Sequence, residues 1–298
     1  MIASAPLSGG KRVVFGFLAV AVLAVPAPAA TAADGWESIG DGMTSGAGGV
    51  AVLSQGPDSV EALVVRDNKK PGENRAARVR MTGGAVTGVD PIEWSGETPV
   101  DLEAVAAVPG RPGEYVALAS AGKGFHLRLD GPRARVLATF PLPAGKPGAN
   151  YEGFALKSGA GGLLAVWADR GQDGRPATLS AAGFDLATRS FGKPAFVDFR
   201  APYPTTDVRH TSDVAITGDD RILVSSASDP GDDGPFDSAV YAVGKLGAGG
   251  TIELAAPPVR IGTFPGHKIE ALTCLSPVCD RVLYGTDDEA RGGRVRVG

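Results

Sequence analysis

The feature that most constrains the fold of this chain is an internal repeat. Most copies open with a short apolar phrase that contains an acidic residue, as in "DLEAVA" from Asp101. A run of alternating apolar residues follows the phrase, as in "EYVALAS" from Glu114, and such alternation is typical of half-buried strands. The segment "GGVAVLSQGPDSVEALVVRDN" from Gly48 gives the same order of strand, turn and strand but has no acid. The chain therefore contains five copies of a unit that opens with a β-hairpin. The other copies begin with "DLEAVA" from Asp101, "NYEGFAL" from Asn150, "TSDVAIT" from Thr211 and "HKIEALT" from His267.

Further strands complete these units, for example "RAARVRM" from Arg75 as a third strand and "GVDPIEW" from Gly88 as a fourth. Four-stranded units that recur about every 50 residues, with no helical period, predict an all-β fold: a single β-propeller of five four-stranded blades. A six-bladed alternative stays open, because the long interval between Glu152 and Asp213 could hide another unit. The last unit lacks a fourth strand, and "GWESIGD", residues 35–41, is predicted to supply it and close the ring.

The N-terminal segment differs from the repeats. It combines a basic start at Lys11 and Arg12, an apolar run from Val13 to Val25 and a tail of small residues. This pattern predicts a secretory signal peptide over residues 1–33 and a propeller domain over residues 34–298. The apolar run is shorter than the ~20 residues that cross a membrane, so we expect a secreted, extracellular protein with no transmembrane anchor.

Charge and composition narrow the possible partners. The chain has 29 Lys+Arg against 33 Asp+Glu, a net charge of -4, which argues against a nucleic-acid partner. Hydrophobic residues make up 43% of the sequence, enough for a folded domain, and 43 Gly with 23 Pro favour many turns. We expect a monomer that binds a small molecule or an extracellular or envelope partner.

The two cysteines, Cys274 and Cys279, lie close together in "TCLSPVCDRV". Exported proteins meet an oxidising compartment, so this pair predicts a disulfide across a tight turn. A zinc site needs more ligands at a different spacing, and the sequence does not offer them.

An acid recurs in four of the five opening phrases. Since each phrase leads into the innermost strand of a blade, these acids are expected near the mouth of the central channel. One interpretation is architectural, in which each carboxylate accepts backbone N–H groups and ties neighbouring blades together. The other is a site for a ligand or a cation. The acids are Glu103, Glu152, Asp213 and Glu270.

The loops between second and third strands are rich in charge and should lie on the same face. They include "RDNKKPGENR" from Arg66, "ADRGQDGRP" from Ala168, "SDPGDDGPFD" from Ser228 and "TDDEARGG" from Thr286. Oxygen ligands spaced through such turns suit calcium, which makes it the candidate cofactor. Asp169 and Asp287 are further candidate ligand-binding residues, and Glu152, Glu270 and Asp287 are the candidate metal ligands.

The repeated phrases also resemble a known group of proteins. Residues 101–106, 151–155 and 268–272, with the strands "LLAVWADRG" and "VLYGTDDEARGG", are similar to secreted phytase-like (esterase-like phytase) propellers and to SdiA-regulated propellers. The resemblance implies a propeller that is either a calcium-supported phosphoesterase or a ligand binder. The chain departs from a phytase in having no clustered run of Lys and Arg for a highly phosphorylated substrate.

Candidate proton carriers lie immediately before two of the acids. His210 and His267 could move protons near neutral pH, with Arg209 and Lys268 beside them to hold an anion. His210, His267 and Lys268 are thus the candidate catalytic residues, and Arg209 is a candidate ligand-binding residue.

Two classes of function follow. The first is a secreted propeller that binds a ligand or envelope partner through its acidic, loop-rich face, with calcium ordering the loops. The second is a hydrolase, either a metal-assisted phosphoesterase or a glycosidase with two carboxyl groups. The aromatic content of 6% argues against the glycosidase, because sugar sites usually contain aromatic platforms.

Overall fold

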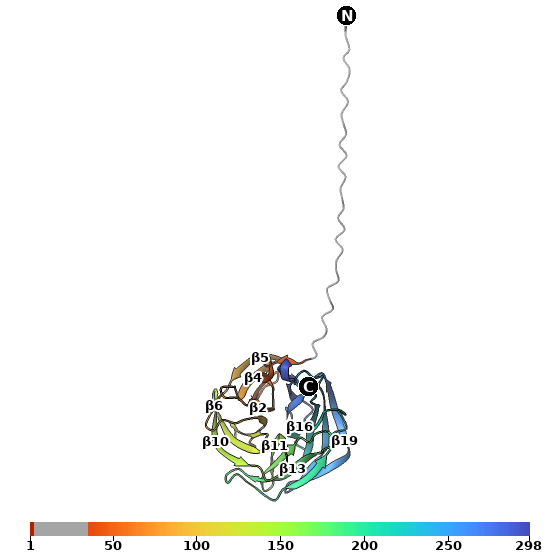
Figure 1. Cartoon of the computed structure of the whole chain (residues 1–298). Helices are drawn as coiled ribbons and strands as arrows, with labels where there is room; N and C mark the ends of the chain where they lie inside the picture. Colours follow the sequence, from red (N-terminus) through yellow and green to blue (C-terminus); the bar gives the residue numbers. More distant parts are fainter. Residues whose placement is uncertain (3–34) are drawn as a thin grey trace. The chain divides into compact units, whose positions relative to one another are not determined.

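The computed structural model describes residues 1–2 and 35–298, and the predicted signal peptide lies almost wholly outside them. Residues Gly35–Gly298 form one compact unit. Within it, five sheets are arranged in a ring around a central axis, with β2, β11 and β16 nearest the centre (Figure 1). The predicted five-bladed propeller is confirmed, and the six-bladed alternative is wrong.

Each sheet runs from an inner strand outwards. The first contains β2 (Gly49–Gln55), β3 (Ser59–Val65), β4 (Ala76–Thr82) and β5 (Ala85–Pro91). The second contains β7 (Leu102–Ala107), β8 (Glu114–Ala119), β9 (Lys123–Asp130) and β10 (Arg133–Pro141). The third contains β11 (Tyr151–Gly159), β12 (Gly162–Asp169), β13 (Ala177–Asp185), β14 (Ser190–Phe191) and β15 (Ala195–Phe199). The fourth contains β16 (Val208–Ile216), β17 (Arg221–Ser228), β18 (Asp237–Gly247) and β19 (Thr251–Pro265). The fifth contains β20 (Ile269–Cys274), β21 (Val282–Asp287), β22 (Gly293–Val297) and β1 (Glu37–Ser38).

The first and fifth sheets show how the blades connect. The predicted strand "GVDPIEW" is divided: β5 completes the first sheet, whereas β6 (Glu93–Ser95) pairs in parallel with β10 at the outer edge of the second. In the fifth sheet β1 pairs antiparallel with β22, with Glu37 opposite Val295 and Ser38 opposite Arg294. The outermost strand of this sheet therefore comes from the start of the described domain.

Hydrophobic clusters fill the spaces between adjacent sheets. One of them includes Trp167, Phe154 and Phe184, and another includes Trp36 and Leu272. Neighbouring inner strands approach closely: a Cβ on Gly49 would lie 2.7 Å from Ala104 Cα, and a Cβ on Gly153 would lie 2.9 Å from Val214 N. Only glycine fits at these two contacts, so Gly49 and Gly153 allow the inner strands to lie this near to each other.

Short segments complete the fold. Two 3₁₀ turns, η1 (Met43–Ser45) and η2 (Glu289–Arg291), lie in loops. The predicted disulfide is confirmed: Cys274 ends β20, and its Sγ is bonded to that of Cys279 in the turn before β21. Among the described residues, no helix is long and apolar enough to cross a membrane.

Candidate functional site

Three glutamates occupy the same special position in three inner strands. In the pairing of β7 with β8, Leu102 lies opposite Ala119 and Ala104 opposite Leu118, so Glu103 is the extra residue of a β-bulge. Glu152 and Glu270 are the extra residues of equivalent bulges in the pairs β11–β12 and β20–β21. A bulge turns its side chain out of the regular alternation, which directs all three carboxyl groups to the channel mouth.

Asp213, predicted to belong to the same set, lies one position later. It pairs with Ser225 after the irregular stretch that follows Arg209. The position equivalent to Glu103 is therefore occupied by Ser212, and Asp213 is equivalent to Ala104. Its Oδ1 accepts the N–H of Val214 at 2.7 Å, and its Oδ2 accepts the N–H of Leu272 in the next blade at 2.7 Å. Asp213 therefore fits the architectural interpretation, because its carboxylate accepts backbone N–H groups from two blades. Glu103, Glu152 and Glu270 do not fit it, because no backbone N–H within residues 35–298 donates to them.

The first blade has Gly48 in the position of the acid. A Cβ added to Gly48 would lie 2.5 Å from the carbonyl oxygen of Leu102 and 3.5 Å from Glu103 Oε2. The carboxyl group of Glu103 therefore lies over this glycine, and a side chain here would collide with the neighbouring inner strand.

Arg209 links three blades at the mouth. Its Nη1 lies 2.8 Å from Glu270 Oε1 and 3.6 Å from Glu152 Oε2, and its Nη2 contacts Asp229. Burial alone would lower the pKa of Arg209, but Glu152, Glu270 and Asp229 outweigh that effect and raise it. The guanidinium is thus permanently charged and occupies the space between the carboxylates of Glu152 and Glu270.

Lys268 has the same role in the fifth blade. Its side chain is 1% exposed, and Nζ lies 3.2 Å from Glu270, 3.8 Å from Asp287 and in contact with Glu289. Burial favours the neutral amine, but Glu270 and Asp287 more than reverse this and raise the pKa of Lys268. The ammonium therefore stays charged despite its burial.

Glu103 is placed differently. It is 8% exposed, and its contact is another acid, Asp101. Burial, followed by the charges of Glu152, Glu270 and Asp101, raises the pKa of Glu103 well above its ordinary value. Asp101 itself accepts from Ser120 Oγ and is paired with Lys69 at 3.0 Å, and its pKa is lowered. These opposite pKa shifts favour an arrangement in which a protonated Glu103 donates a hydrogen bond to an ionised Asp101.

Other carboxyl groups at the mouth also hold protons more tightly than usual. Burial, partly offset by Arg209 and increased by Glu270, raises the pKa of Glu152 to about 7. Burial and Glu270 raise the pKa of Asp67 to about 6 and that of Asp287 well above its ordinary value. Glu152 Oε2 is buried and accepts no hydrogen bond within the described domain.

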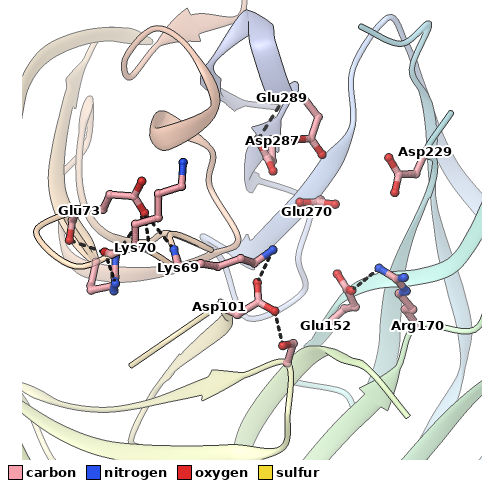
Figure 2. A network of polar contacts seen from close by, with 12 residues as sticks. Lys69, Lys70, Glu73, Asp101, Glu152, Arg170, Asp229, Glu270, Asp287 and Glu289 are labelled. Carbon is pink, nitrogen blue, oxygen red and sulfur yellow. Dashed lines mark hydrogen bonds and ion pairs between the residues drawn. The ribbon is translucent and has the colours of Figure 1, made fainter. Parts of the chain in front are cut away.

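The charged loops reach the mouth as predicted. Figure 2 shows the carboxyl groups of Asp101, Glu152, Asp229 and Glu270 around one space, with Lys69 extending from the loop after β3 towards Asp101. Arg170, from the loop after β12, contacts Glu152 Oε1 at 3.3 Å. Below the acids, the five inner strands line a cavity of about 250 Å³ that continues the channel.

The two candidate histidines differ in their surroundings. His210 lies within β16 instead of in a loop; its Nδ1 accepts the N–H of Ala201, and its Nε2 donates to the carbonyl of Asp173. Burial lowers the pKa of His210, so the ring is neutral and both its nitrogens bind backbone. His267 Nδ1 lies 2.8 Å from Asp288 Oδ2, and its ring packs on Trp36 at 4.5 Å. These contacts give His210 a structural role, whereas a proton-carrying role for His267 stays a prediction.

The remaining predicted residues do not all meet. Asp169 accepts the N–H of Asn150 and pairs with Arg175, and within residues 35–298 its carboxyl group makes no contact with a bulge glutamate. The predicted calcium ligands Glu152, Glu270 and Asp287 are separated by Arg209 and Lys268, and no group of three or more potential metal ligands occurs in the described part of the chain. These three residues do not fit one calcium ion.

Sequence reasoning missed Asp67, Asp101 and Lys69 as members of the site. Asp101 lies two residues before Glu103, and the other two lie in the charged loop after β3. Asp101 has a φ of 64°, a conformation that is uncommon for a residue other than glycine. The sequence did offer a signal for Asp101: it lies two residues before Glu103, as the candidate residue Lys268 lies two residues before Glu270.

Comparisons with known proteins assign no family to the chain. No protein-family model matches the chain, and the search of curated proteins found no match. Among solved structures, a glycoside hydrolase is 9% identical with a TM-score of 0.48; the alignment covers 87% of this chain and 62% of that one. A putative exo-beta-1,3-galactanase from Bifidobacterium bifidum is 12% identical with a TM-score of 0.47, covering 83% and 85%. The WD40 repeats of RRP9 are 10% identical with a TM-score of 0.40, covering 85% and 98%. Such similarities assign no family or activity, and the phytase-like resemblance stays a prediction.

Proposed function

We propose that the protein is an exported binding propeller whose channel mouth takes a positively charged ligand, either a small organic cation or a cationic group of an extracellular or envelope partner. The observation that carries this proposal is the buried carboxyl group of Glu103, which contacts the acid Asp101 and forms no ion pair with a lysine or arginine within residues 35–298. Burial and the neighbouring acids favour the protonated form of Glu103, so a cation bound at this position would replace that proton.

The charge balance of the channel mouth also supports a cationic ligand. Carboxyl groups outnumber the cations Lys69, Arg170, Arg209 and Lys268. The surplus acids are those with raised pKa values, Asp67, Glu103, Glu152 and Asp287. Export rests on the disulfide and on the predicted signal peptide.

An organic ammonium suits this arrangement better than calcium. Calcium takes six to eight oxygen ligands at about 2.3–2.6 Å, and Arg209 and Lys268 stand between the carboxylates predicted to supply them. An ammonium needs only a few acceptors, such as the carboxyl groups of Asp101 and Glu103. Calcium ordering of the loops remains a proposal that the same experiment tests.

Isothermal titration calorimetry with putrescine, and separately with calcium chloride, tests the proposal at pH 6 and pH 8. We expect putrescine to bind more tightly at pH 8 and to release protons, measured by repeating the titration in buffers of different ionisation enthalpy. Glu103→Gln should weaken binding at least tenfold and reduce the proton release, whereas Asp58→Asn, at an exposed turn, should change neither. If neither cation binds at either pH, or if Glu103→Gln binds like the wild type, the proposal is wrong.

A second candidate function is hydrolysis, favoured by the pKa of about 7 for Glu152. A carboxyl group in that range can act as a general acid at neutral pH, with Asp229, whose pKa is lowered, as an ionised neighbour. The cations Arg209 and Lys268 could hold a phosphate, but Arg209 stands between Glu152 and Glu270, where a glycosidase would place the sugar. Assays with nitrophenyl phosphate and nitrophenyl glycosides, on the wild type and on Glu152→Gln, would detect such an activity and show whether it depends on this residue.

A further inference from the structure

A separate cavity of about 260 Å³ lies on the third blade, under the connection from β10 to β11. Its walls include Tyr151 and Phe196, with Ala144 and Ala149 from the connection and Ser180 on β13. This volume is below the roughly 300–1,000 Å³ of ordinary ligand pockets, so it suits a single small ring.

The register of the third sheet explains the chemistry of these walls. Across four strands, Tyr151 lies opposite Asp169, Asp169 opposite Thr178, and Thr178 opposite Asp198. One row deeper, Ser180 lies opposite Phe196. Side chains on one face of a sheet repeat every second residue, so the two rows form one surface beneath the connection.

The charged groups of this surface are already paired. Asp169 is paired with Arg175, and Asp198 with Lys146 at 2.5 Å, while Thr178 also donates to Asp198 at 3.2 Å. A charged ligand would leave an unbalanced charge next to these pairs, at a cost that a neutral ligand avoids.

Two hydroxyl groups remain available. Neither the Tyr151 hydroxyl nor the Ser180 hydroxyl has a hydrogen-bond partner within residues 35–298. Burial and Asp169 raise the pKa of Tyr151, so its hydroxyl keeps the proton and can donate as well as accept. The Tyr151 ring is held firmly, since a Cβ on Gly122 would lie 2.9 Å from its Cε2 and a Cβ on Gly145 would lie 2.2 Å from its oxygen.

Phe196 supplies the second aromatic wall. It is 49% exposed, one of the few large hydrophobic side chains in the described domain that solvent reaches so freely. An exposed aromatic ring beside a small cavity offers an apolar face to a ligand at low cost, because solvent loss from that face favours binding.

We infer that this cavity is a binding site for one neutral, hydroxylated ring of the size of a single pyranose, held between Tyr151 and Phe196 and hydrogen-bonded by the hydroxyl groups of Tyr151 and Ser180. The site is independent of the cation site proposed at the channel mouth, since its own acids are neutralised and none of the bulge glutamates lines it.

Saturation-transfer NMR with methyl glucoside, methyl galactoside and methyl mannoside tests the inference on the full chain. We expect at least one of these neutral pyranosides to receive saturation from the protein. Phe196→Ala should weaken its binding at least fivefold, and Tyr151→Phe should weaken it by a smaller factor. Val259→Ala removes a similarly exposed side chain from β19 and should leave binding unchanged.

Thermal unfolding of each variant shows whether the fold is retained. Because Phe196 is half exposed, its replacement should shift the midpoint little. If none of the three pyranosides receives saturation, or if Phe196→Ala and Tyr151→Phe both bind like the wild type, the inference is overturned.

Discussion

Two parts of the channel mouth, the Glu270 corner and the Glu103 corner, have a glutamate in the same backbone position but in opposite surroundings. Glu270 and Glu103 are both the extra residues of β-bulges on inner strands. Glu270 contacts Lys268 and Arg209, whereas Glu103 contacts Asp101. The bulge therefore sets where a carboxyl group points, and residues from neighbouring loops and blades set its charge.

The largest expected effect concerns the support of the Glu270 corner. Removing residues 35–41 deletes β1 and the buried side chains Trp36 and Ile39, which pack against the fifth blade. Losing two large core side chains should lower the free energy of unfolding by about 5 kcal/mol or more. Urea denaturation measures this change, and size-exclusion chromatography should show association through the exposed edge of β22. A variant with an unchanged midpoint would show that the corner does not depend on β1.

Replacing Lys268 by Met should have the next largest effect. It leaves Glu270, Asp287 and Glu289 around a site with no ammonium, and breaking a buried ion pair in this way costs about 3–5 kcal/mol. Urea denaturation of Lys268→Met should show this loss, and Lys193→Met, at an exposed position, should stay within about 0.5 kcal/mol of the wild type. Equal stability of both variants would mean that the two corners do not differ in charge pairing.

The most direct comparison replaces each glutamate by glutamine. Glu270→Gln removes a charge that two buried cations contact, so it should lower the free energy of unfolding by about 1–3 kcal/mol at pH 7. Glu103→Gln replaces a protonated carboxyl group by an amide of the same shape and should stay within about 0.5 kcal/mol of the wild type. Similar losses in both variants would contradict the assignment of a proton to Glu103.

A smaller effect should appear in the pH dependence of stability. The pKa of Glu152 rises from 4.5 to about 7 on folding, so between these values the folded protein holds a proton that the unfolded chain has released. The free energy of unfolding should therefore fall as pH increases across this window, with a contribution of at most one proton from this residue. Glu152→Gln should flatten this part of the curve, whereas Asp58→Asn should not.

The fold was largely predictable because the repeat is a local pattern. Alternation located the hairpins, and the cysteine spacing predicted the disulfide between Cys274 and Cys279. The fate of "GVDPIEW" was not predictable, because alternation identifies a strand and does not say which sheet it joins. The position of Asp213 was one residue off for a similar reason: the register after Arg209 depends on a bulge that the letters do not reveal.

The site was only partly predictable. The acids and the charged loops were found from the sequence, and both lie at the channel mouth. The ion pairs of these acids could not be predicted from the sequence, because Arg209 belongs to the fourth blade and contacts Glu152 of the third and Glu270 of the fifth. Contacts between blades depend on the closure of the ring, so no local pattern indicates them.

Gly48 gives the channel mouth a direction. A propeller with identical acids in all its blades would present a ligand with several equivalent orientations around the axis. Here Gly48 in the first blade and Ser212 in the fourth interrupt the set of acids. Glu270 is paired with Arg209 and Lys268, whereas Glu103 contacts Asp101. The orientations of a molecule that enters along the axis are therefore not equivalent. A ring built from repeated units can in this way favour a single pose of an asymmetric ligand.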